Sequence, residues 1–186
     1  MKNGGETSPG VILKDYLVPL HQTSRDIAHN EEMTTSDLMA YSFDGIAKQH
    51  ACVRRTQPLP SVDAVYIDSQ NTPYFIEFKN GKLSNVGKKE PSLTSKVTAS
   101  VLLALDLHLL ESLASLQKKG RFIFVYRDDT TNVYNQQIEN HILEESGTDA
   151  IKQVNAISWL FRKAESLTKE QFNQTFLPGI LPHSQP

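Results

Sequence analysis

The feature of this sequence that most constrains its fold is a pair of β-rich runs joined by a short turn-forming segment. The runs are Val62–Asp68 and Tyr74–Lys79, and residues 69–73 between them read Ser-Gln-Asn-Thr-Pro. β-Branched and aromatic residues favour strands, whereas Ser, Asn and Pro favour turns. The pattern therefore predicts a β-hairpin.

The segments around the hairpin alternate between helix and strand. A Thr-x-x-Asp start signal followed by helical apolar spacing predicts a helix over 36–50. A longer helix is predicted over 92–119, a buried strand over 121–126, and further helices over 133–145 and 168–176. A helix between two strands of one sheet usually forms a right-handed parallel crossover. The order therefore predicts an α/β fold, in which a mixed central β-sheet (hairpin plus parallel crossover strand) is flanked by helices.

The length of 186 residues suits a single domain. We expect a partly flexible leader over 1–30, the folded domain over 31–177 and a flexible tail over 178–186. The single cysteine, Cys52, excludes an intrachain disulfide.

The longest apolar segment, residues 97–116, contains Asp106, His108 and Glu111. Charges at these positions are typical of a buried amphipathic helix and not of a membrane span. The N-terminal residues do not lead into a signal peptide. We therefore expect a cytoplasmic protein without membrane contact, and a homo-oligomer stays an open alternative.

Three charged residues of the hairpin are predicted to converge at one of its ends. With the turn centred on Gln70, Asp63 lies opposite Glu77, and Lys79 shares a strand face with Glu77. Glu77 lies between Ile76 and Phe78, so its charge would be costly unless it were paired or bound to a metal. Two carboxylates at one point suit Mg²⁺ or Mn²⁺, and a lysine beside them can stabilise developing phosphate charge. The alternative is a surface hairpin with an ordinary salt bridge.

This hairpin, over Ser61–Gly81, resembles the motif of the PD-(D/E)xK nuclease superfamily, and the likeness extends over about residues 36–126. The resemblance implies a restriction-endonuclease-like core. It also implies that Asp63 and Glu77 bind a metal together with the backbone carbonyl of Phe78, and that Lys79 serves catalysis. The sequence departs from the family pattern in having Val62 in place of proline before the first acid.

The acid that this superfamily often takes from its first helix is not unique here. Asp44, at the edge of the apolar stripe, is the first choice, and Glu32 is the competitor if the helix starts earlier. Lys96 is placed on the helix after the hairpin, where this superfamily often adds a polar residue to the site.

The function predicted from these residues is phosphodiester hydrolysis that depends on Mg²⁺ or Mn²⁺, with DNA favoured over RNA as the substrate. Four lysines would hold the nucleic-acid backbone: Lys82, Lys88, Lys89 and Lys96. The net charge of −2 argues mildly against a general nucleic-acid binder. The alternatives are a catalytically inactive nuclease-fold module that binds nucleic acid or a protein partner, and a structural subunit of a larger complex.

Overall fold

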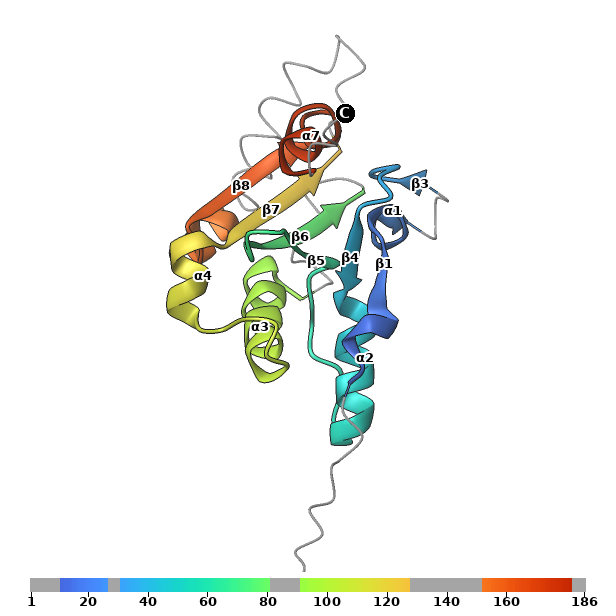
Figure 1. The fold of residues 1–186 in the computed structure, drawn as a ribbon, viewed down its shortest axis with the longest axis vertical. Coiled ribbons are helices and arrows are strands. Elements are labelled where there is room, and N and C mark those ends of the chain that lie inside the picture. Colours follow the sequence, from blue (N-terminus) through green and yellow to red (C-terminus); the bar gives the residue numbers. More distant parts are fainter. Residues whose placement is uncertain (1–10, 27–30, 81–90, 128–151, 182–186) are drawn as a thin grey trace, which may run out of the picture.

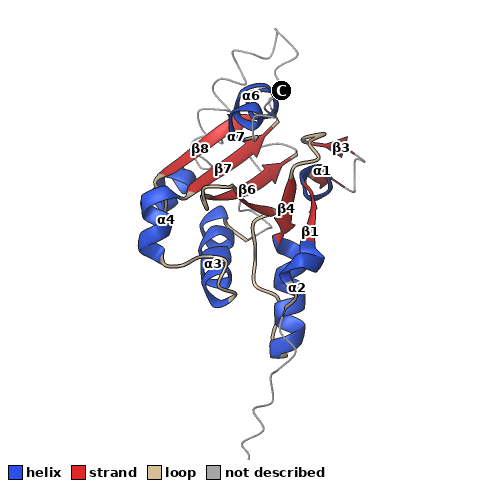
Figure 2. Cartoon of the chain, viewed as in Figure 1, coloured by secondary structure: helices blue, strands red, loops and turns tan. Residues whose placement is uncertain are grey.

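The centre of the molecule is a six-stranded mixed β-sheet (Figures 1 and 2). The computed structural model describes residues 11–26, 31–80, 91–127 and 152–181. In spatial order the strands are β1 (Leu17–Pro19), β4 (Met39–Ser42), β5 (Ala64–Ile67), β6 (Pro73–Lys79), β7 (Arg121–Tyr126) and β8 (Lys163–Thr168). The first four are antiparallel neighbours, whereas β6–β7 and β7–β8 are parallel pairs. The predicted mixed sheet, hairpin plus parallel crossover, is confirmed.

The turn between β5 and β6 is built around Asp68. Its carboxylate Oδ1 accepts hydrogen bonds from the backbone N–H groups of Gln70 at 2.9 Å and Thr72 at 2.7 Å. Asn71 takes a positive φ of 63°, which asparagine tolerates better than most residues. This turn fixes the pairing of Ala64 with Ile76, and hence the register of the hairpin.

Helices cover both faces of the sheet (Figure 1). On one face, α2 (Phe43–Arg54), α3 (Leu93–Asp106) and α4 (Leu113–Lys119) pack on a core that includes Phe75 and Phe122. On the other, α1 (Leu20–Thr23) and the C-terminal turns pack on a core that includes Ile76 and Ile123. The C-terminal turns are α6 (Lys169–Gln171), the π-helical η4 (Phe172–Phe176) and α7 (Leu177–Ile180). Two short helical turns, η1 (Leu13–Tyr16) and η3 (Ser158–Leu160), lie elsewhere in the chain. A separate two-stranded antiparallel sheet is formed by β2 (Arg25–Asp26) and β3 (Glu31–Glu32). None of the helices in the described ranges is long and apolar enough to span a bilayer.

The helix predicted over 36–50 begins later, at Phe43, and runs to Arg54. The apparent start signal belongs to local turns, since the Thr34 hydroxyl accepts a hydrogen bond from the N–H of Ser36 at 3.2 Å. Residues 39–42 form β4 instead, because pairing with β1 and β5 uses their backbone groups in two ladders. Apolar residues at these positions suit either a helix face or a strand, so spacing alone gave the wrong boundary.

The long helix predicted over 92–119 is two helices, α3 and α4. Ser92 caps the first and accepts a hydrogen bond from the N–H of Ser95 at 3.1 Å, and Ser112 caps the second in the same way. Between them His108 has a φ of 56°. Apolar residues continue through this break, because they pack on the same core, and so the hydrophobic pattern does not reveal it.

The predicted leader contributes to the fold. Residues 17–19 form β1, an edge strand of the main sheet, and Leu20 is fully buried. The expected boundary at residue 31 is therefore wrong, although residues 1–10 and 27–30 lie outside the described ranges.

At the other end, the Thr168 capping box is confirmed, with Thr168 and Gln171 bonded reciprocally. The helical path continues to Ile180, past the expected end before Pro178, because Pro178 occupies the first turn of α7, where its missing N–H costs little. The predicted first residue of the tail, Pro178, is therefore still part of a helix. Strand β8 was not predicted, and the helix expected over 133–145 lies outside the described residues.

Candidate active site

A polar pocket of about 290 Å³ opens at the end of the hairpin where the sequence places its charges. Asp63, Glu77, Lys79 and Lys96 all line it. The Ala64–Ile76 register, continued by one residue, sets Asp63 opposite Glu77, as predicted. Side chains alternate along β6, so Glu77 and Lys79 share the face on which α2 and α3 pack.

Asp63 is held by the backbone of the neighbouring strand. The N–H of Phe78 donates a hydrogen bond to Asp63 Oδ2 at 2.6 Å. Burial raises the pKa of the Asp63 carboxyl well above its usual value, and the negative charge of Glu77 raises it further. Lys96 and the Phe78 N–H oppose the rise. The geometry thus fixes this carboxylate beside a second one, at an electrostatic cost.

Glu77 is the most buried acid of the pocket, with its side chain 7% exposed. The Lys96 ammonium lies 2.6 Å from Glu77 Oε1, whereas Oε2 is buried and finds no hydrogen-bond partner within the described residues. Burial raises the pKa of this carboxyl to about 7, against the opposing charge of Lys96 and with an upward contribution from Asp44. An acid buried with one oxygen unmatched is costly unless something else binds it.

Lys96 reaches the pocket from the first turn of α3. Burial lowers the pKa of its ammonium, but the charges of Glu77 and Asp63 outweigh that effect and raise it. Lys96 is therefore charged and pairs with Glu77 in this structure. The sequence offered two roles for Lys96, a polar residue of the site and a contact to the nucleic-acid backbone, and the structure places its ammonium beside Glu77.

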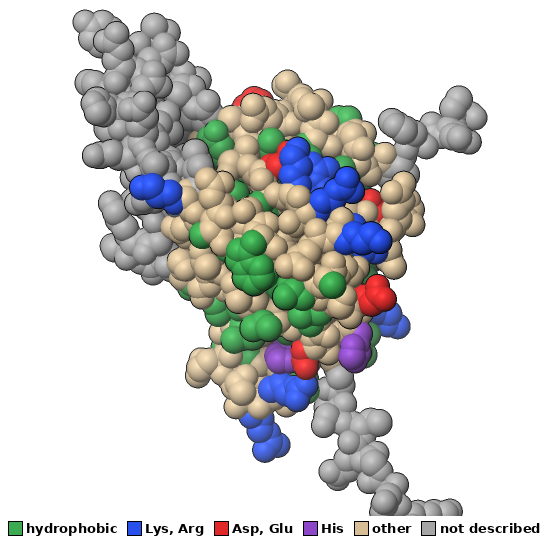
Figure 3. All heavy atoms as spheres, turned by 90° about the vertical axis from the view of Figure 1, so that its left-hand side faces the viewer, with side chains coloured by type: hydrophobic (Ala, Val, Ile, Leu, Met, Phe, Trp, Pro, Cys, Tyr) green, Lys and Arg blue, Asp and Glu red, His purple; other side chains and the backbone are tan. Residues whose placement is uncertain are grey.

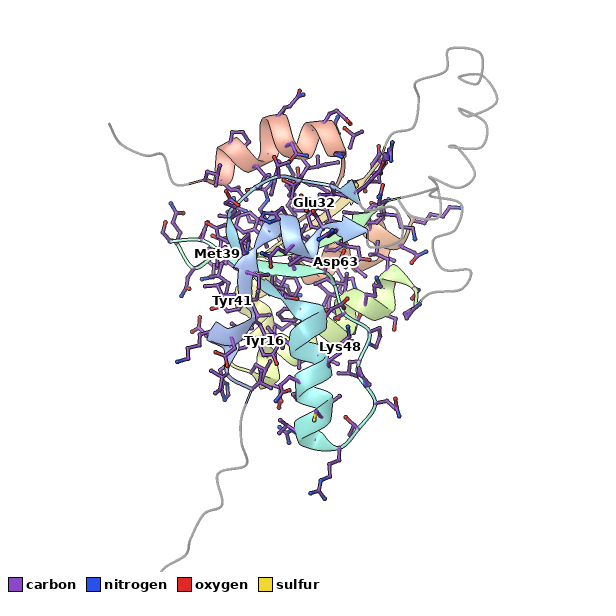
Figure 4. All side chains as sticks on the ribbon, turned by 90° about the vertical axis from the view of Figure 1, so that its right-hand side faces the viewer. Tyr16, Glu32, Met39, Tyr41, Lys48 and Asp63 are labelled. Atoms are coloured by element: carbon purple, nitrogen blue, oxygen red, sulfur yellow. The ribbon has the colours of Figure 1, made fainter. Side chains whose placement is uncertain are left out.

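The structure distinguishes the two candidates for the first-helix acid. Asp44 lies in the first turn of α2, accepts a hydrogen bond from the Ser61 hydroxyl at 2.5 Å, and raises the pKa values of Asp63 and Glu77. Glu32 lies on β3 and lines a different pocket beside Lys169. Figure 4 labels Asp63 and Glu32 on either side of the α1–β2 segment. Asp44 is therefore the candidate whose charge acts on Asp63 and Glu77, although its side chain does not line the pocket.

Asp63 and Glu77 are the groups that could hold a cation, and their chemistry fits one. A divalent ion would relieve their mutual repulsion and give Glu77 Oε2 a partner. Within the described ranges, no group of three or more His, Cys, Asp or Glu side chains is arranged to hold a metal. Such an ion would therefore complete its coordination with waters and a backbone carbonyl, an arrangement that Mg²⁺ accepts.

Comparison of the chain with family models, curated proteins and solved structures finds no match.

Four residues of the pocket were not predicted from the sequence: Thr23, Ser24, Arg25 and Asn80. The first three belong to the predicted leader, where Thr23 ends α1 and Ser24 and Arg25 follow it. Their short polar stretch has no periodicity that marks a site, so only the packing of α1 against the sheet reveals them. Lys82, Lys88 and Lys89 lie outside the described residues.

Proposed function

We propose that the protein is a metal-dependent nuclease that hydrolyses phosphodiester bonds of nucleic acid, with DNA the favoured substrate and Mg²⁺ or Mn²⁺ the cofactor. One observation carries the proposal. Glu77 is buried beside Asp63 with Oε2 unmatched by any hydrogen bond in the described part of the chain. A fold tolerates such an arrangement where a ligand balances it, and a hard cation balances two carboxylates best. The resemblance of this hairpin to the PD-(D/E)xK motif supports the same chemistry.

Asp63 and Glu77 would hold the cation, together with the backbone carbonyl of Phe78. When bound, a divalent ion supplies Lewis-acid activation of water and of the phosphoryl group. The chain orients both acids in advance, because the Phe78 N–H fixes Asp63 Oδ2 and Lys96 fixes Glu77 Oε1. Preorganised groups avoid the cost of reorganisation during the reaction.

Lys79 would serve as the catalytic lysine. It ends β6 two residues after Glu77, on the same face, and it lines the pocket. Its positive charge can stabilise the negative charge that develops on a phosphate during cleavage. Lys82, Lys88 and Lys89 follow in sequence and would hold the flanking backbone.

Cleavage assays with matched variants test the proposal. Wild-type protein should cut plasmid or single-stranded DNA with Mg²⁺ or Mn²⁺ and not with EDTA. Glu77→Gln and Lys79→Ala should each lower cleavage by at least about 100-fold, since removal of one transition-state electrostatic contact typically costs 100- to 1,000-fold. Glu111→Gln, which removes an exposed carboxylate outside the pocket, is the control and should cut as wild type does. Pure wild type that cuts neither DNA nor RNA with either metal would overturn the proposal.

The ion pair between Lys96 and Glu77 also favours a second candidate, a catalytically inactive nuclease-fold module that binds nucleic acid or a protein. In such a module Lys96 would serve as the permanent counter-ion of Glu77. The dependence of binding on divalent ions and on Glu77 distinguishes the inactive module from the nuclease. A module should bind its partner equally well in wild type and Glu77→Gln, with or without divalent ions.

A further inference from the structure

The pocket has a wall that comes from outside the hairpin and α3. It is lined by Thr23, the last residue of α1, by Ser24, and by Arg25, the first residue of β2. Figure 4 shows this segment close to the labelled Asp63. Among the described residues that line the pocket, Arg25 is the one arginine, and its side chain is exposed.

The backbone that presents Arg25 is held firmly. Ser24 is 4% exposed, and its hydroxyl donates to the carbonyl of His21 at 2.9 Å and accepts from the N–H of Thr34 at 3.3 Å. The carbonyl of Ser24 also accepts a hydrogen bond from the N–H of Met33 at 3.3 Å. Arg25 itself pairs with Glu32 in the β2–β3 ladder. A long side chain on so fixed a base samples a limited region, which includes this pocket.

The charges that line the pocket suit a further cationic side chain that contacts a phosphate. Asp63 and Glu77 line the pocket with Lys79 and Lys96, and Asp44 lies close enough to influence both acids. Lys96 is bonded to Glu77, so its charge is already used to offset a carboxylate. Lys79 shares the strand face of Glu77, so a cation on another wall of the pocket would let an entering phosphate be bound from two sides.

We propose that Arg25 binds the phosphodiester that enters this pocket, and so positions it against the Asp63–Glu77 pair. A planar guanidinium offers two parallel N–H donors that match two phosphate oxygens, whereas an ammonium acts as a point charge. Arg25 is thus a substrate-positioning residue supplied by the N-terminal segment. This inference rests on the proposed nuclease function for its choice of ligand.

A ligand with a single phosphodiester tests the proposal without contacts elsewhere on the protein. The probe is the dinucleotide thymidylyl-thymidine, titrated by NMR in the presence of Ca²⁺. Its methylphosphonate analogue, which lacks the negative charge, is titrated in parallel. Arg25→Ala should weaken binding of the charged probe by at least about tenfold and leave binding of the analogue unchanged, because only the former loses a charge-assisted hydrogen bond. Arg25→Lys should be intermediate, since it keeps the charge and loses the fork.

Arg162→Ala is the matched control, because Arg162 is exposed and does not line the pocket. It should bind both probes as wild type does. Equal affinity of Arg25→Ala and wild type for the charged probe would overturn the proposal, as would equal losses for both probes or wild type that does not bind the dinucleotide. Cleavage by wild type with Mn²⁺ is measured separately. A protein that cuts nothing yet shows Arg25-dependent binding would overturn the nuclease function and keep this inference.

Discussion

Glu77 is buried and Glu165 is partly buried in the same sheet, and they differ in how completely their carboxylate oxygens are bonded. Glu165, on β8, has a partner for each oxygen: Arg121 bonds Oε1, and Lys163 Nζ lies 2.5 Å from Oε2. Glu77, on β6, has Lys96 at Oε1 and no hydrogen-bond partner at Oε2 within the described residues. The side chain of Glu165 is 18% exposed and that of Glu77 is 7% exposed, so Glu77 is both more buried and less fully bonded.

The pKa values of the two glutamates move in opposite directions because they differ in both burial and partners. Burial raises the pKa of Glu77 to about 7, and Lys96 does not offset it. Burial also acts upward on Glu165, but hydrogen bonds from Lys163 and Arg121 outweigh it and lower the pKa. A buried carboxylate with both oxygens hydrogen-bonded is compatible with a stable fold. One with an unbonded oxygen destabilises the fold until a ligand binds that oxygen.

Glu165 itself has both oxygens bonded, whereas Nε of its partner Arg121 is buried and finds no hydrogen-bond partner within the described residues. Its partner Arg121 stacks over the rings of Tyr74 at 5.7 Å and Phe176 at 5.1 Å, which fixes the guanidinium. Figure 3 views the molecule from the side where α4 and β8 lie in Figure 1, and Lys and Arg side chains gather on its upper part with acidic side chains beside them. Such a mixed surface is typical of structural ion pairs.

The largest expected difference between the two glutamates is in metal binding. Glu77→Gln should weaken Mn²⁺ binding by at least about 1,000-fold, or about 4 kcal/mol, because it removes one of the two carboxylates at the site. Glu165→Gln should leave it unchanged. Isothermal titration calorimetry or EPR of free Mn²⁺ measures both. Equal Mn²⁺ affinity in the two variants would mean that the cation does not bind at Glu77.

The next effect is on the pH dependence of stability in EDTA. The pKa of Glu77 is raised from 4.5 to about 7 on folding, so the folded state holds this proton more tightly than the unfolded state. The contribution of Glu77 to stability is therefore most favourable below pH 4.5 and is lost as the pH rises to about 7. At about 1.4 kcal/mol per pKa unit, the loss is about 3 kcal/mol.

Urea unfolding of wild type and Glu77→Gln across this pH range tests the sign. Between acidic pH and about pH 7 the variant should lose less stability than wild type does, because it lacks the part due to Glu77 and keeps the part due to Asp63. Glu165→Gln should behave in the opposite sense. The lowered pKa of Glu165 gives stability that is present above its unfolded pKa and lost as the pH falls through its folded pKa. Parallel pH profiles for all three proteins would contradict the comparison.

The smallest effect concerns the third acid of the site. Asp44→Asn should shift the pKa of Glu77 slightly downward, because Asp44 contributes a like charge that raises it. Glu32→Gln, which alters the acid of the other pocket, should leave the pKa of Glu77 where it is. NMR titration of the glutamate carboxyl carbons measures both. A shift with Glu32→Gln and none with Asp44→Asn would reverse the choice of acid.

The sequence by itself determined the hairpin and what depends on it. Turn-forming residues around Gln70 and the period of two along each strand set Asp63 opposite Glu77 and put Lys79 on the same face. The strand over 121–126 was also predicted with its observed bounds. These features are local, because neighbouring residues fix the turn, the register and the alternation of side chains.

Only the tertiary structure decided which distant residues meet the hairpin. Lys96 bonds Glu77 because α3 crosses the sheet at that point, and Arg25 reaches the pocket because α1 packs on the opposite core. The edge strands β1 and β8 were missed for a related reason. Their residues are mostly half-buried or exposed, so their hydrophobic pattern is weak and their pairing partner defines them. Contacts between distant segments depend on how whole elements pack, and no local pattern of residues specifies that.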